Sequence, residues 1–411
     1  EISACLVGSE MCIRDRYYRV IINDKLPTIL RGKMLMDSKA DLKIRNKKKI
    51  LASVRENGEI SKRDLQRILG LSWSTVSQLT SELTDEKYLC VSGKRNMGVG
   101  RCPEMLTVNP KSHLIIGVDV NMAFIRIAIG DLTAKIISKK SFPLVRTYDE
   151  VMKKIIFTID SMMAFYGKEN IAALAFAAQG YVDINTGTST CIYDIENWRN
   201  VPLKQIFEEK YGLPVTVVHD NFAVMKAESV LGNTVKNSSN AMLVYYSKNI
   251  GVNASFLMNG EIYLGYNGAS GEVGLSLVPS FKNSEPVILE RCVTEDNILS
   301  EFIEDHPESG VNTFEELIEK AKSGEEEPLN AFKLFGKRLG AAVSNCINVL
   351  NPEIVVLAGI DSEYSYLYKK ELLSVIRKYS GSASRKIILS KNNDDFTVIG
   401  AILTAIQKYC E

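Results

Sequence analysis

The chain has 411 residues, of which 45% are hydrophobic and 24% charged, and its formal net charge is +1. This balance is typical of soluble globular proteins, and the length allows two or three domains that each bury a core. No run of about 18 uncharged apolar residues occurs, so we predict no transmembrane helix. The eight cysteines are scattered without a Cys-x-x-Cys pair, which favours a reduced cytoplasmic chain without a cysteine-rich zinc cluster.

Charge is unevenly distributed along the chain. Residues 41–110 carry 13 Lys and Arg against 8 Asp and Glu, whereas residues 111–411 carry 30 against 36. A basic head on an acidic body favours an anionic partner for the head alone. Small basic domains are common, so charge by itself does not identify that partner as nucleic acid.

The first 40 residues differ in pattern from the rest. The segment 1–16 has no helical or strand period and lacks the uninterrupted apolar core of a secretory signal. It resembles a translated sequencing-adapter artefact, so residues 1–40 are expected to be an artefact or a disordered leader. The biological start is then Met34 or Met36, which N-terminal mass spectrometry of the natively expressed protein tests.

Three helices are predicted between residues 42 and 86. The first ends at Asn57-Gly58, the second is opened by a capping box at residues 61–64 and stops at Gly70, and Ser72 caps the third. Two short helices joined by a glycine-containing turn predict a helix-turn-helix. The side chains expected to face inward are Ile44, Ile50, Leu51, Val54, Leu65, Ile68, Leu69, Val76, Leu79 and Leu83.

The outward side of the third helix is rich in short polar side chains. These are Ser74, Thr75, Ser77, Gln78 and Ser81. Such side chains can approach base edges, and Gln78 can make a bidentate contact to adenine. An exposed Ser/Thr-rich face without function is the alternative. We expect Trp73 to pack at the start of the helix and not to read a base.

A glycine-rich, basic hairpin follows the helices. Strands are predicted at residues 88–92 and 105–108, and the tip between them contains Lys94, Arg95 and Arg101. This tip has the character of a wing, with basic side chains suited to phosphates or to the minor groove. The hairpin completes a winged helix-turn-helix domain predicted at residues 41–110.

The remainder alternates strands and helices and predicts an α/β body. Residues 114–130 contain two apolar strands joined at Asn121-Met122-Ala123, and residues 241–258 repeat such a hairpin. We therefore expect two related lobes, at residues 111–240 and 241–411, with a cleft between them. The last helix, near residues 397–408, can return to the first lobe.

Several short motifs follow in a fixed order between residues 42 and 408. They are Arg45-x-x-x-x-Ile50-Leu51, Gly70-Leu71-Ser72-x-x-Thr75-Val76-Ser77, Gly100-Arg101, Gly117-Val118-Asp119, Gly180-x-Val182-Asp183, Trp198-x-x-Val201-Pro202-Leu203, Pro214-Val215, Asp220-Asn221, Gly271-Glu272-Val273-Gly274 and Leu350-Asn351-Pro352-Glu353-Ile354-Val355-Val356-Leu357. Together they resemble the winged-helix repressor branch of the ROK family of repressors, open reading frames and kinases. The resemblance implies a multidomain protein with two actin-like, ribonuclease H-like lobes that close over a sugar.

The three stretches that hold ATP in the kinases of this family differ here. The first reads Asp119-Val120-Asn121-Met122-Ala123, the second Ser247-Lys248-Asn249-Ile250-Gly251, and the third Ala358-Gly359-Ile360. Glycines or hydroxyls are missing from all three. Because phosphoryl transfer depends on positioning phosphates and metal, we expect no kinase activity, no catalytic residue and no cofactor.

The resemblance also bears on metal and sugar. The family's zinc ligands are replaced, the histidine by Leu275 and the cysteines by Phe281, Asn283 and Ile288, so no metal is expected. Asp220 matches the base of the family kinases, and Glu272 and Glu290 match carboxylates that grip sugar hydroxyls. The residues expected to bind sugar are His219, Asp220, Glu272, Glu290 and Asn197. The alternative is that Asp220 only caps its helix and Glu272 only stabilises a loop.

These features predict a transcriptional regulator, a repressor of carbohydrate genes, that binds operator DNA and a sugar effector as a homodimer or homotetramer. One alternative is a sugar kinase with a DNA-binding head, supported by Asp119 and Asp220. Another is a DNA-bound regulator that has lost effector binding. A coupled ATPase assay across a sugar panel separates the first two, and thermal-shift screening addresses the third.

Overall fold

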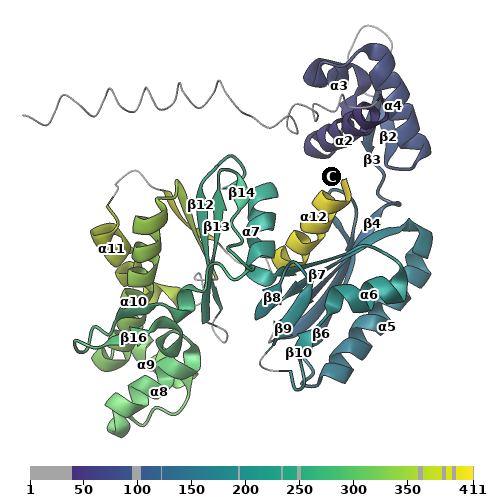
Figure 1. Cartoon of the computed structure of the whole chain (residues 1–411). Helices are drawn as coiled ribbons and strands as arrows, with labels where there is room; N and C mark the ends of the chain where they lie inside the picture. The colour runs from purple at the N-terminus through teal and green to yellow at the C-terminus, as the bar shows by residue number, and fades with distance from the viewer. Residues whose placement is uncertain are drawn as a thin grey trace, which may run out of the picture.

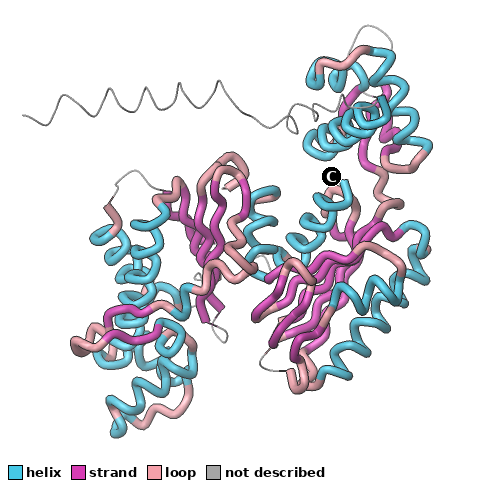
Figure 2. Tube along the Cα trace, in the orientation of Figure 1, coloured by secondary structure: helices cyan, strands magenta, loops and turns pink. Residues whose placement is uncertain are grey.

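The computed structural model describes residues 39–94, 103–121, 123–192, 195–232, 235–247, 251–359, 364–381, 386–390 and 395–410. Figure 1 shows a small head and two larger α/β lobes, with the C-terminal helix α12 lying between the head and the first lobe. Figure 2 shows that each lobe is built on its own sheet, flanked by helices. Within the described residues, no helix is long and apolar enough to cross a membrane. The multidomain architecture predicted from the sequence is confirmed.

The head is a winged helix. Its elements are α2 (Lys39–Asn57), β1 (Ile60–Ser61), α3 (Lys62–Leu69), α4 (Trp73–Asp85), β2 (Leu89–Lys94) and β3 (Glu104–Val108). The strands form a sheet in the order β1-β3-β2. The Ser61 hydroxyl accepts the Asp64 amide at 3.2 Å, and the Ser72 hydroxyl accepts the Thr75 amide at 3.1 Å. These caps satisfy amides that the first turn leaves free, so both helices begin where the sequence predicted.

Two of the side chains predicted to be buried in the head are exposed. Ile44 and Ile68 are each 53% exposed, whereas Ile50 and Leu65 are fully buried. Ile44 lies six residues before Ile50, which places it roughly 120° away around the helix, and Asn46 takes the buried position. Helix α3 has only two turns and fully buries a single apolar side chain, Leu65.

The first lobe is organised around a five-stranded sheet in the order β11-β7-β4-β5-β6. The strands are β4 (Leu114–Val120), β5 (Phe124–Gly130), β6 (Ile136–Pro143), β7 (Ile171–Ala178) and β11 (Val215–His219). A small sheet is added by β8 (Tyr181–Asp183), β9 (Thr188–Cys191) and β10 (Arg199–Val201). Helices α5 (Tyr148–Tyr166) and α6 (Leu203–Tyr211) share a core with one face of the large sheet. On the other face lie α7 (Asp220–Val230) and α12 (Phe396–Cys410).

The second lobe repeats the same strand order with additional helices. Its sheet runs β14-β13-β12-β17-β18, formed by β12 (Ala241–Ser247), β13 (Gly251–Met258), β14 (Glu261–Ile262), β17 (Ile354–Ala358) and β18 (Lys386–Ser390). A second hairpin, β15 (Leu277–Pro279) and β16 (Pro286–Ile288), is flanked by the short helices η2 (Val273–Leu275) and η3 (Leu289–Cys292). The longer helices are α8 (Glu295–Asp305), α9 (Phe314–Ser323), α10 (Glu326–Leu350) and α11 (Lys369–Tyr379). In both lobes an antiparallel hairpin leads into parallel strands, which is the ribonuclease H-like arrangement.

Helix α12 packs closely on the first lobe. A Cβ atom at Gly400 would lie 1.7 Å from the carbonyl oxygen of Ala223 in α7, and one at Gly117 in β4 would lie 2.7 Å from the Ile402 side chain. Side chains at these two positions would push α12 away from its neighbours. The two glycines therefore let α12 sit against α7 and the sheet at once.

Candidate functional site

The outward face of α4 is one candidate surface. Ser74, Gln78 and Ser81 are exposed there, whereas Thr75 and Ser77 are half-buried. The Thr75 hydroxyl lies 2.8 Å from that of Ser72, within the helix cap. The side chain of Lys94, together with Arg95 and Arg101, lies outside the described residues. The residues for which DNA contact remains a prediction are Ser74, Thr75, Ser77, Gln78, Lys94, Arg95 and Arg101.

Trp73 differs from expectation. It occupies the first position of α4 and is 53% exposed, so the prediction that it packs at the helix start is wrong. The buried face of α4 is formed by Val76, Leu79, Thr80 and Leu83, and Trp73, three residues before Val76, lies at the N-terminal edge of that stripe, where its ring is left exposed. Its indole instead borders a shallow hollow together with Ser74, Ser77 and Gln78.

The C-terminal half of α4 is acidic but partly neutralised. Glu82 forms ion pairs with Lys43 at 2.8 Å and Lys47 at 2.9 Å, both from α2. Hydrogen bonds from these two lysines, and then from Gln78, lower the pKa of Glu82 to about 2. The Gln78 side-chain amide donates to Glu82 at 3.0 Å, and this bond would have to open for Gln78 to grip adenine with both of its polar groups.

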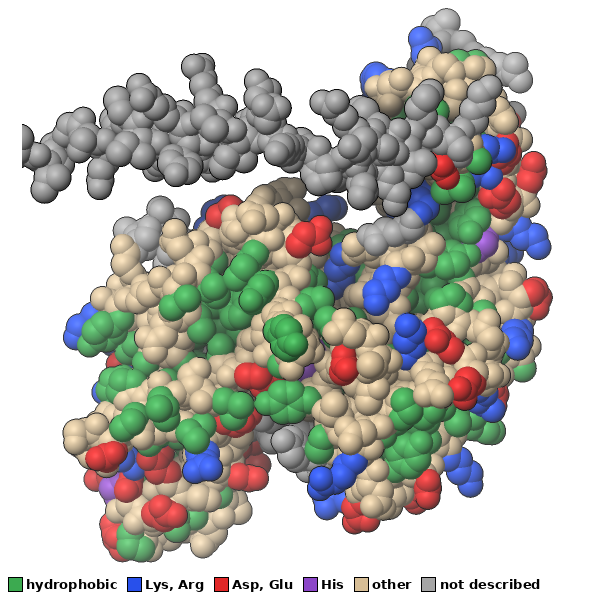
Figure 3. All heavy atoms as spheres, viewed as in Figure 1, with side chains coloured by type: hydrophobic (Ala, Val, Ile, Leu, Met, Phe, Trp, Pro, Cys, Tyr) green, Lys and Arg blue, Asp and Glu red, His purple; other side chains and the backbone are tan. Residues whose placement is uncertain are grey.

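A cavity of about 370 Å³ lies between the two lobes and brings together four of the predicted sugar residues. It is lined by Gln179, Gly180, Tyr181, Ile192, His219, Asp220, Tyr245, Gly251, Val252, Asn253, Glu272, Leu275 and Glu290. A volume of this size suits a small ligand. Figure 3 shows acidic and hydrophobic side chains next to one another along the junction of the lobes.

The structure does not bring Asn197 to this cavity. Asn197 is exposed and has a φ of 63°, in the turn that leads into β10. Asparagine tolerates this left-handed conformation better than most residues, which gives it a structural role at that position. Its neighbour Trp198 is buried, and the indole nitrogen donates to Ser189 at 2.8 Å.

His219 and Asp220 reach the cavity at the junction of β11 and α7. The Nδ1 atom of His219 lies 2.8 Å from Asp220 Oδ1, and the same carboxylate oxygen accepts the Asn221 amide at 2.7 Å. Burial acts against the charged imidazole, but the carboxylates of Asp220 and Glu272 outweigh it and raise the pKa of His219. Asp220 therefore both stabilises the start of α7 and presents a carboxylate to the cavity.

An asparagine pair that the sequence analysis missed joins the lobes at this site. The side-chain amide of Asn221 donates to Asn253 Oδ1 at 2.8 Å and to the Ala254 carbonyl at 2.9 Å. Asn253 in turn donates to Glu272 at 3.3 Å. The only sequence signal for Asn253 is an amide within an otherwise apolar strand. Through this chain the carboxylate of Glu272 in lobe 2 is tied to the first turn of α7.

Glu290 is positioned by two glycines. Cβ atoms built at Gly251 and Gly274 would lie 2.5 Å and 3.3 Å from Glu290 Oε1, so the carboxylate occupies space that side chains there would fill. Burial and the nearby Glu272 raise the pKa of Glu290. The Glu290 carbonyl accepts a bond from the Asn297 side chain at 3.0 Å, which fixes the backbone of η3.

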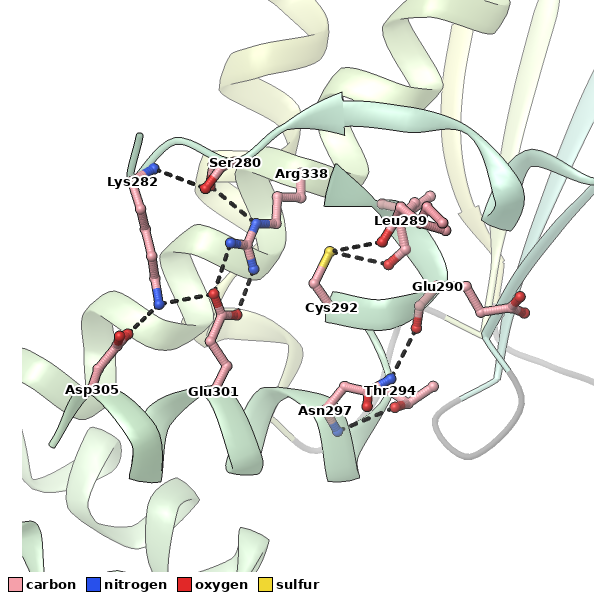
Figure 4. A network of polar contacts seen from close by, with 11 residues as sticks. Ser280, Lys282, Leu289, Glu290, Cys292, Thr294, Asn297, Glu301, Asp305 and Arg338 are labelled. Atoms are coloured by element: carbon pink, nitrogen blue, oxygen red, sulfur yellow. Dashed lines mark hydrogen bonds and ion pairs between the residues drawn. The ribbon is translucent and has the colours of Figure 1, made fainter. Parts of the chain in front are cut away.

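A buried arginine stabilises the segment that carries Glu290 (Figure 4). Arg338 is 1% exposed and donates to the two Glu301 oxygens at 2.6 and 2.8 Å. Its Nε atom donates to the Ser280 carbonyl at 3.2 Å, and Lys282 pairs with Glu301 at 2.8 Å. In Figure 4 the Glu290 side chain points away from this network, so the network positions the segment without using that carboxylate.

The turn between β4 and β5 is closed by its own side chain. Asn121 Oδ1 accepts the amides of Ala123 at 2.9 Å and Phe124 at 3.0 Å. These are backbone donors that a phosphate in this turn would need. Met122 and residues 248–250 and 360–363 lie outside the described residues, so parts of all three stretches that differ from the kinases are not seen.

Two buried ionisable side chains lie beside this turn. Asp119 and Arg126 are cross-strand neighbours, and Asp119 Oδ2 is 4.0 Å from Arg126 Nη1, each without a hydrogen-bond partner among the described residues. Burial, and then the charge of Asp220, raise the pKa of Asp119 to about 8. Arg126 also lies 4.2 Å from the centre of the Phe124 ring. An internal cation therefore faces Asp119.

The positions where the family's zinc ligands would fall hold Leu275, Phe281, Asn283 and Ile288, none of which is a usual zinc ligand. Leu275 lines the cavity between the lobes, and Phe281 lies on the exposed β15–β16 hairpin. Among the residues that the structure describes, no cluster of three or more His, Cys, Asp or Glu side chains could hold a metal ion.

The geometry defines a class of protein: a winged helix-turn-helix head on a two-lobed, actin-like body with a polar cleft. Residues 115–408 match the family model "ROK family", and residues 45–89 match "Winged helix-turn-helix DNA-binding". The chain belongs to the ROK family, and its head is a winged helix-turn-helix DNA-binding domain.

Individual proteins extend this comparison. The chain is 27% identical to the xylose repressor of Caldicellulosiruptor bescii over 389 residues, covering 89% of this chain and 96% of the repressor. A solved ROK family transcriptional regulator, a homologue of the E. coli MLC protein, superposes with a TM-score of 0.73 at 20% identity, covering 90% of this chain and 96% of that one. A ROK glucokinase from Streptomyces griseus, solved with glucose and AMPPNP, gives a TM-score of 0.57 at 19% identity over 72% of this chain and 99% of its own. The two superpositions establish the fold alone.

Proposed function

We propose that this protein is a sugar-responsive transcriptional repressor that binds operator DNA through its head and a sugar in its interlobe cleft. The observation that carries the proposal is the cleft itself, in which Asp220, Glu272 and Glu290 converge on one cavity. The likeness to the xylose repressor of Caldicellulosiruptor bescii over nearly the whole chain supports the same function. We place the protein in the cytoplasm, as a homodimer or homotetramer.

The chemistry of the cleft favours an uncharged polyhydroxylated ligand. Each carboxylate oxygen can accept a proton from a sugar hydroxyl, and such bonds to a charged acceptor are stronger than neutral ones. The described lining residues include three carboxylates and neither lysine nor arginine. An anionic ligand such as a sugar phosphate would be repelled by this field. Xylose is the first sugar to test, because it is the one named for the repressor relative.

We further propose that the protein does not transfer phosphate. Asn121 occupies the amides of the β4–β5 turn, and Arg126 supplies a positive charge next to Asp119. Asn121 takes the amide hydrogen bonds that a bound phosphate would accept, and Arg126 takes the place of the positive charge of a bound metal ion. Phosphoryl transfer depends on positioning phosphate and metal. Asp119 and Asp220 are the residues that keep the kinase alternative open.

A continuous set of contacts runs from the cleft to the head. Helix α7 begins at Asp220, packs on the sheet of lobe 2 through Val224 and Met225, and packs on α12 at Gly400. Sugar binding that draws the lobes together would therefore displace α7, and α12 with it. Because α12 packs on α7 without an intervening side chain at Gly400, a displacement of α7 would move α12 by a similar distance.

The far end of α12 meets the head at a cluster of aromatic residues. The Tyr409 hydroxyl lies 3.1 Å from the Tyr88 hydroxyl and 2.8 Å from His113 Nδ1. His113 stacks on Tyr88 at 3.7 Å between ring centres, and its Nε2 lies 3.0 Å from the carbonyl of Glu86, which directly follows α4. A movement of α12 would change the orientation of α4 and, in a dimer, the spacing of two operator half-sites.

The experiment begins with a duplex selected from a random pool by the full chain. Operator affinity is then measured by fluorescence anisotropy across a sugar panel, with a coupled ATPase assay in parallel. We expect one sugar to weaken operator binding and none to drive ATP turnover. Asp220→Asn should lose the sugar response while its sugar-free operator affinity stays unchanged, and Glu285→Gln, on the exposed β15–β16 turn, should behave as wild type. Sugar-dependent ATP turnover at ordinary kinase rates would overturn the proposal.

A further inference from the structure

The exposed face of α4 has two chemically different halves. From Trp73 to Ser81 the helix carries no charged residue, and its surface combines one large aromatic side chain with serine hydroxyls. Beyond that point Glu82 and Asp85 lie on the same hollow. The two halves would meet DNA differently, because phosphates repel the acidic half.

The acidic half is also tied to the rest of the head. Glu82 is held by Lys43 and Lys47 of α2, so two of the basic side chains of that helix are already engaged. Entry of α4 into the major groove by its N-terminal half keeps Glu82 and Asp85 farthest from the phosphates. In that orientation, Trp73 is at the leading end of the helix.

The Trp73 indole is available for such a contact. It is 53% exposed. Ser74 and Ser77, which border the same hollow, are small enough to let the ring approach a groove floor. The one apolar group that base pairs present in the major groove is the 5-methyl of thymine. An exposed indole matches that group in chemistry better than it matches any donor or acceptor on the base edges.

We propose that Trp73 is a specificity-determining residue of the head, which reads a thymine by packing its indole against the 5-methyl group. The inference rests on the proposed function, since it requires that the head binds operator DNA. Trp73 would then act beside Gln78, the apolar contact selecting thymine and the amide selecting adenine. The operator half-site selected by this protein contains a thymine at the position that Trp73 reaches.

The test removes methyl groups from DNA one at a time. The duplex is selected from a random pool by the full chain, and each thymine of a half-site is replaced in turn by deoxyuridine, which lacks only the methyl. For the wild type we expect one replacement to weaken binding about fourfold per half-site, as burial of a single methyl implies. In Trp73→Ala that same replacement should have no further effect, which makes the two changes a double-mutant cycle.

Two controls keep the result interpretable. Ile68→Ala removes another half-exposed apolar side chain of the head and should retain the wild-type pattern of deoxyuridine effects. Hydrogen exchange of helices α2, α3 and α4 reports whether the head of Trp73→Ala remains folded, with an expected protection equal to that of the wild type.

The outcomes separate this inference from the proposed function. Selection of no specific duplex by the wild type would contradict DNA binding itself, and the inference would fail with it. A specific duplex whose deoxyuridine effects are the same in wild type and Trp73→Ala would overturn the Trp73 assignment alone. Uniform weakening of all sequences by Trp73→Ala would also overturn it, because the indole would then contact the DNA backbone.

Discussion

In lobe 1 the sheet β11-β7-β4-β5-β6 carries α7 and α12, packed backbone to backbone at Gly400. In lobe 2 the sheet of the same order carries the segment from η2 to α10, in which Arg338 stabilises the loops that present Glu290. Sheets of the same strand order thus carry closely packed helices in lobe 1 and a buried network of charged side chains in lobe 2. We infer that lobe 1 transmits a movement to the head through α7 and α12, and that lobe 2 supplies two of the three carboxylates of the cavity, Glu272 and Glu290, so each contribution should be open to separate disruption.

Gly400→Val should have the largest effect, and it disrupts lobe 1. Because a Cβ would lie 1.7 Å from the Ala223 carbonyl, α12 cannot keep its position on α7. The free energy of unfolding should fall by more than about 4 kcal/mol, measured by urea denaturation. Gly381→Ala is the matched control, since a Cβ there meets nothing within 4 Å, and it should change stability by less than about 0.5 kcal/mol. If Gly400→Val is as stable as the wild type, α12 does not pack on α7 as closely as described.

Arg338→Met should have the next largest effect, and it disrupts lobe 2. It leaves Glu301 partly buried without its bidentate partner, which should cost about 3 kcal/mol of stability. Sugar affinity should fall while sugar-free operator affinity stays near the wild-type value. The control Arg67→Met breaks an exposed pair with Asp64 and should cost less than about 1 kcal/mol. A loss of operator affinity equal to the loss of sugar affinity would argue against separate roles for the lobes.

Asp119→Asn tests the buried Asp119–Arg126 pair in the sheet of lobe 1. The pKa of Asp119 is raised to about 8, far above the unfolded value, so the wild type loses stability as pH rises from about 4 towards 8. The variant lacks this titration and should have the higher unfolding midpoint at pH 9, by roughly 5 °C. Near pH 4 the two proteins should be alike. The sugar response should persist, whereas a kinase would depend on this carboxylate. Identical pH profiles for both proteins would contradict the raised pKa.

Tyr409→Phe should have the smallest effect on stability and a selective effect on signalling. It removes the hydroxyl that contacts Tyr88 and His113, at an expected cost of about 1 kcal/mol. Sugar affinity should be unchanged, and the sugar-induced loss of operator affinity should shrink. Tyr379→Phe, at an exposed ring in lobe 2, is the control. If the sugar-induced loss of operator affinity is unchanged in Tyr409→Phe, the aromatic cluster does not transmit the movement of α12 to the head.

The sequence predicted the parts of the fold that depend on local signals. The caps at Ser61 and Ser72, the two hairpins that open the lobes and the C-terminal ends of the first two head helices follow from residues near one another in the chain. His219, Asp220, Glu272 and Glu290 could be grouped only through a family resemblance, and the structure brings all four to one cavity.

Features that depend on tertiary register were missed. Asn253 is distinguished by its bonds to Asn221 and Glu272, which join two lobes and leave no periodic signal. The pair of Arg338 with Glu301 spans 37 residues and is equally invisible to local patterns. Trp73 was predicted to pack at the helix start, and its spacing from Val76 and Thr80 agrees with that prediction, so its exposure could be seen only in the structure.

The central claim is that the cleft and the operator-binding head are coupled, and thermodynamic reciprocity tests it most directly. The sugar found in the panel is titrated by calorimetry into the free protein and into its operator complex. Coupling requires that the sugar binds the operator complex at least about fivefold more weakly than it binds the free protein. The same factor must describe how much the sugar weakens operator binding. Equal sugar dissociation constants with and without operator would contradict the account.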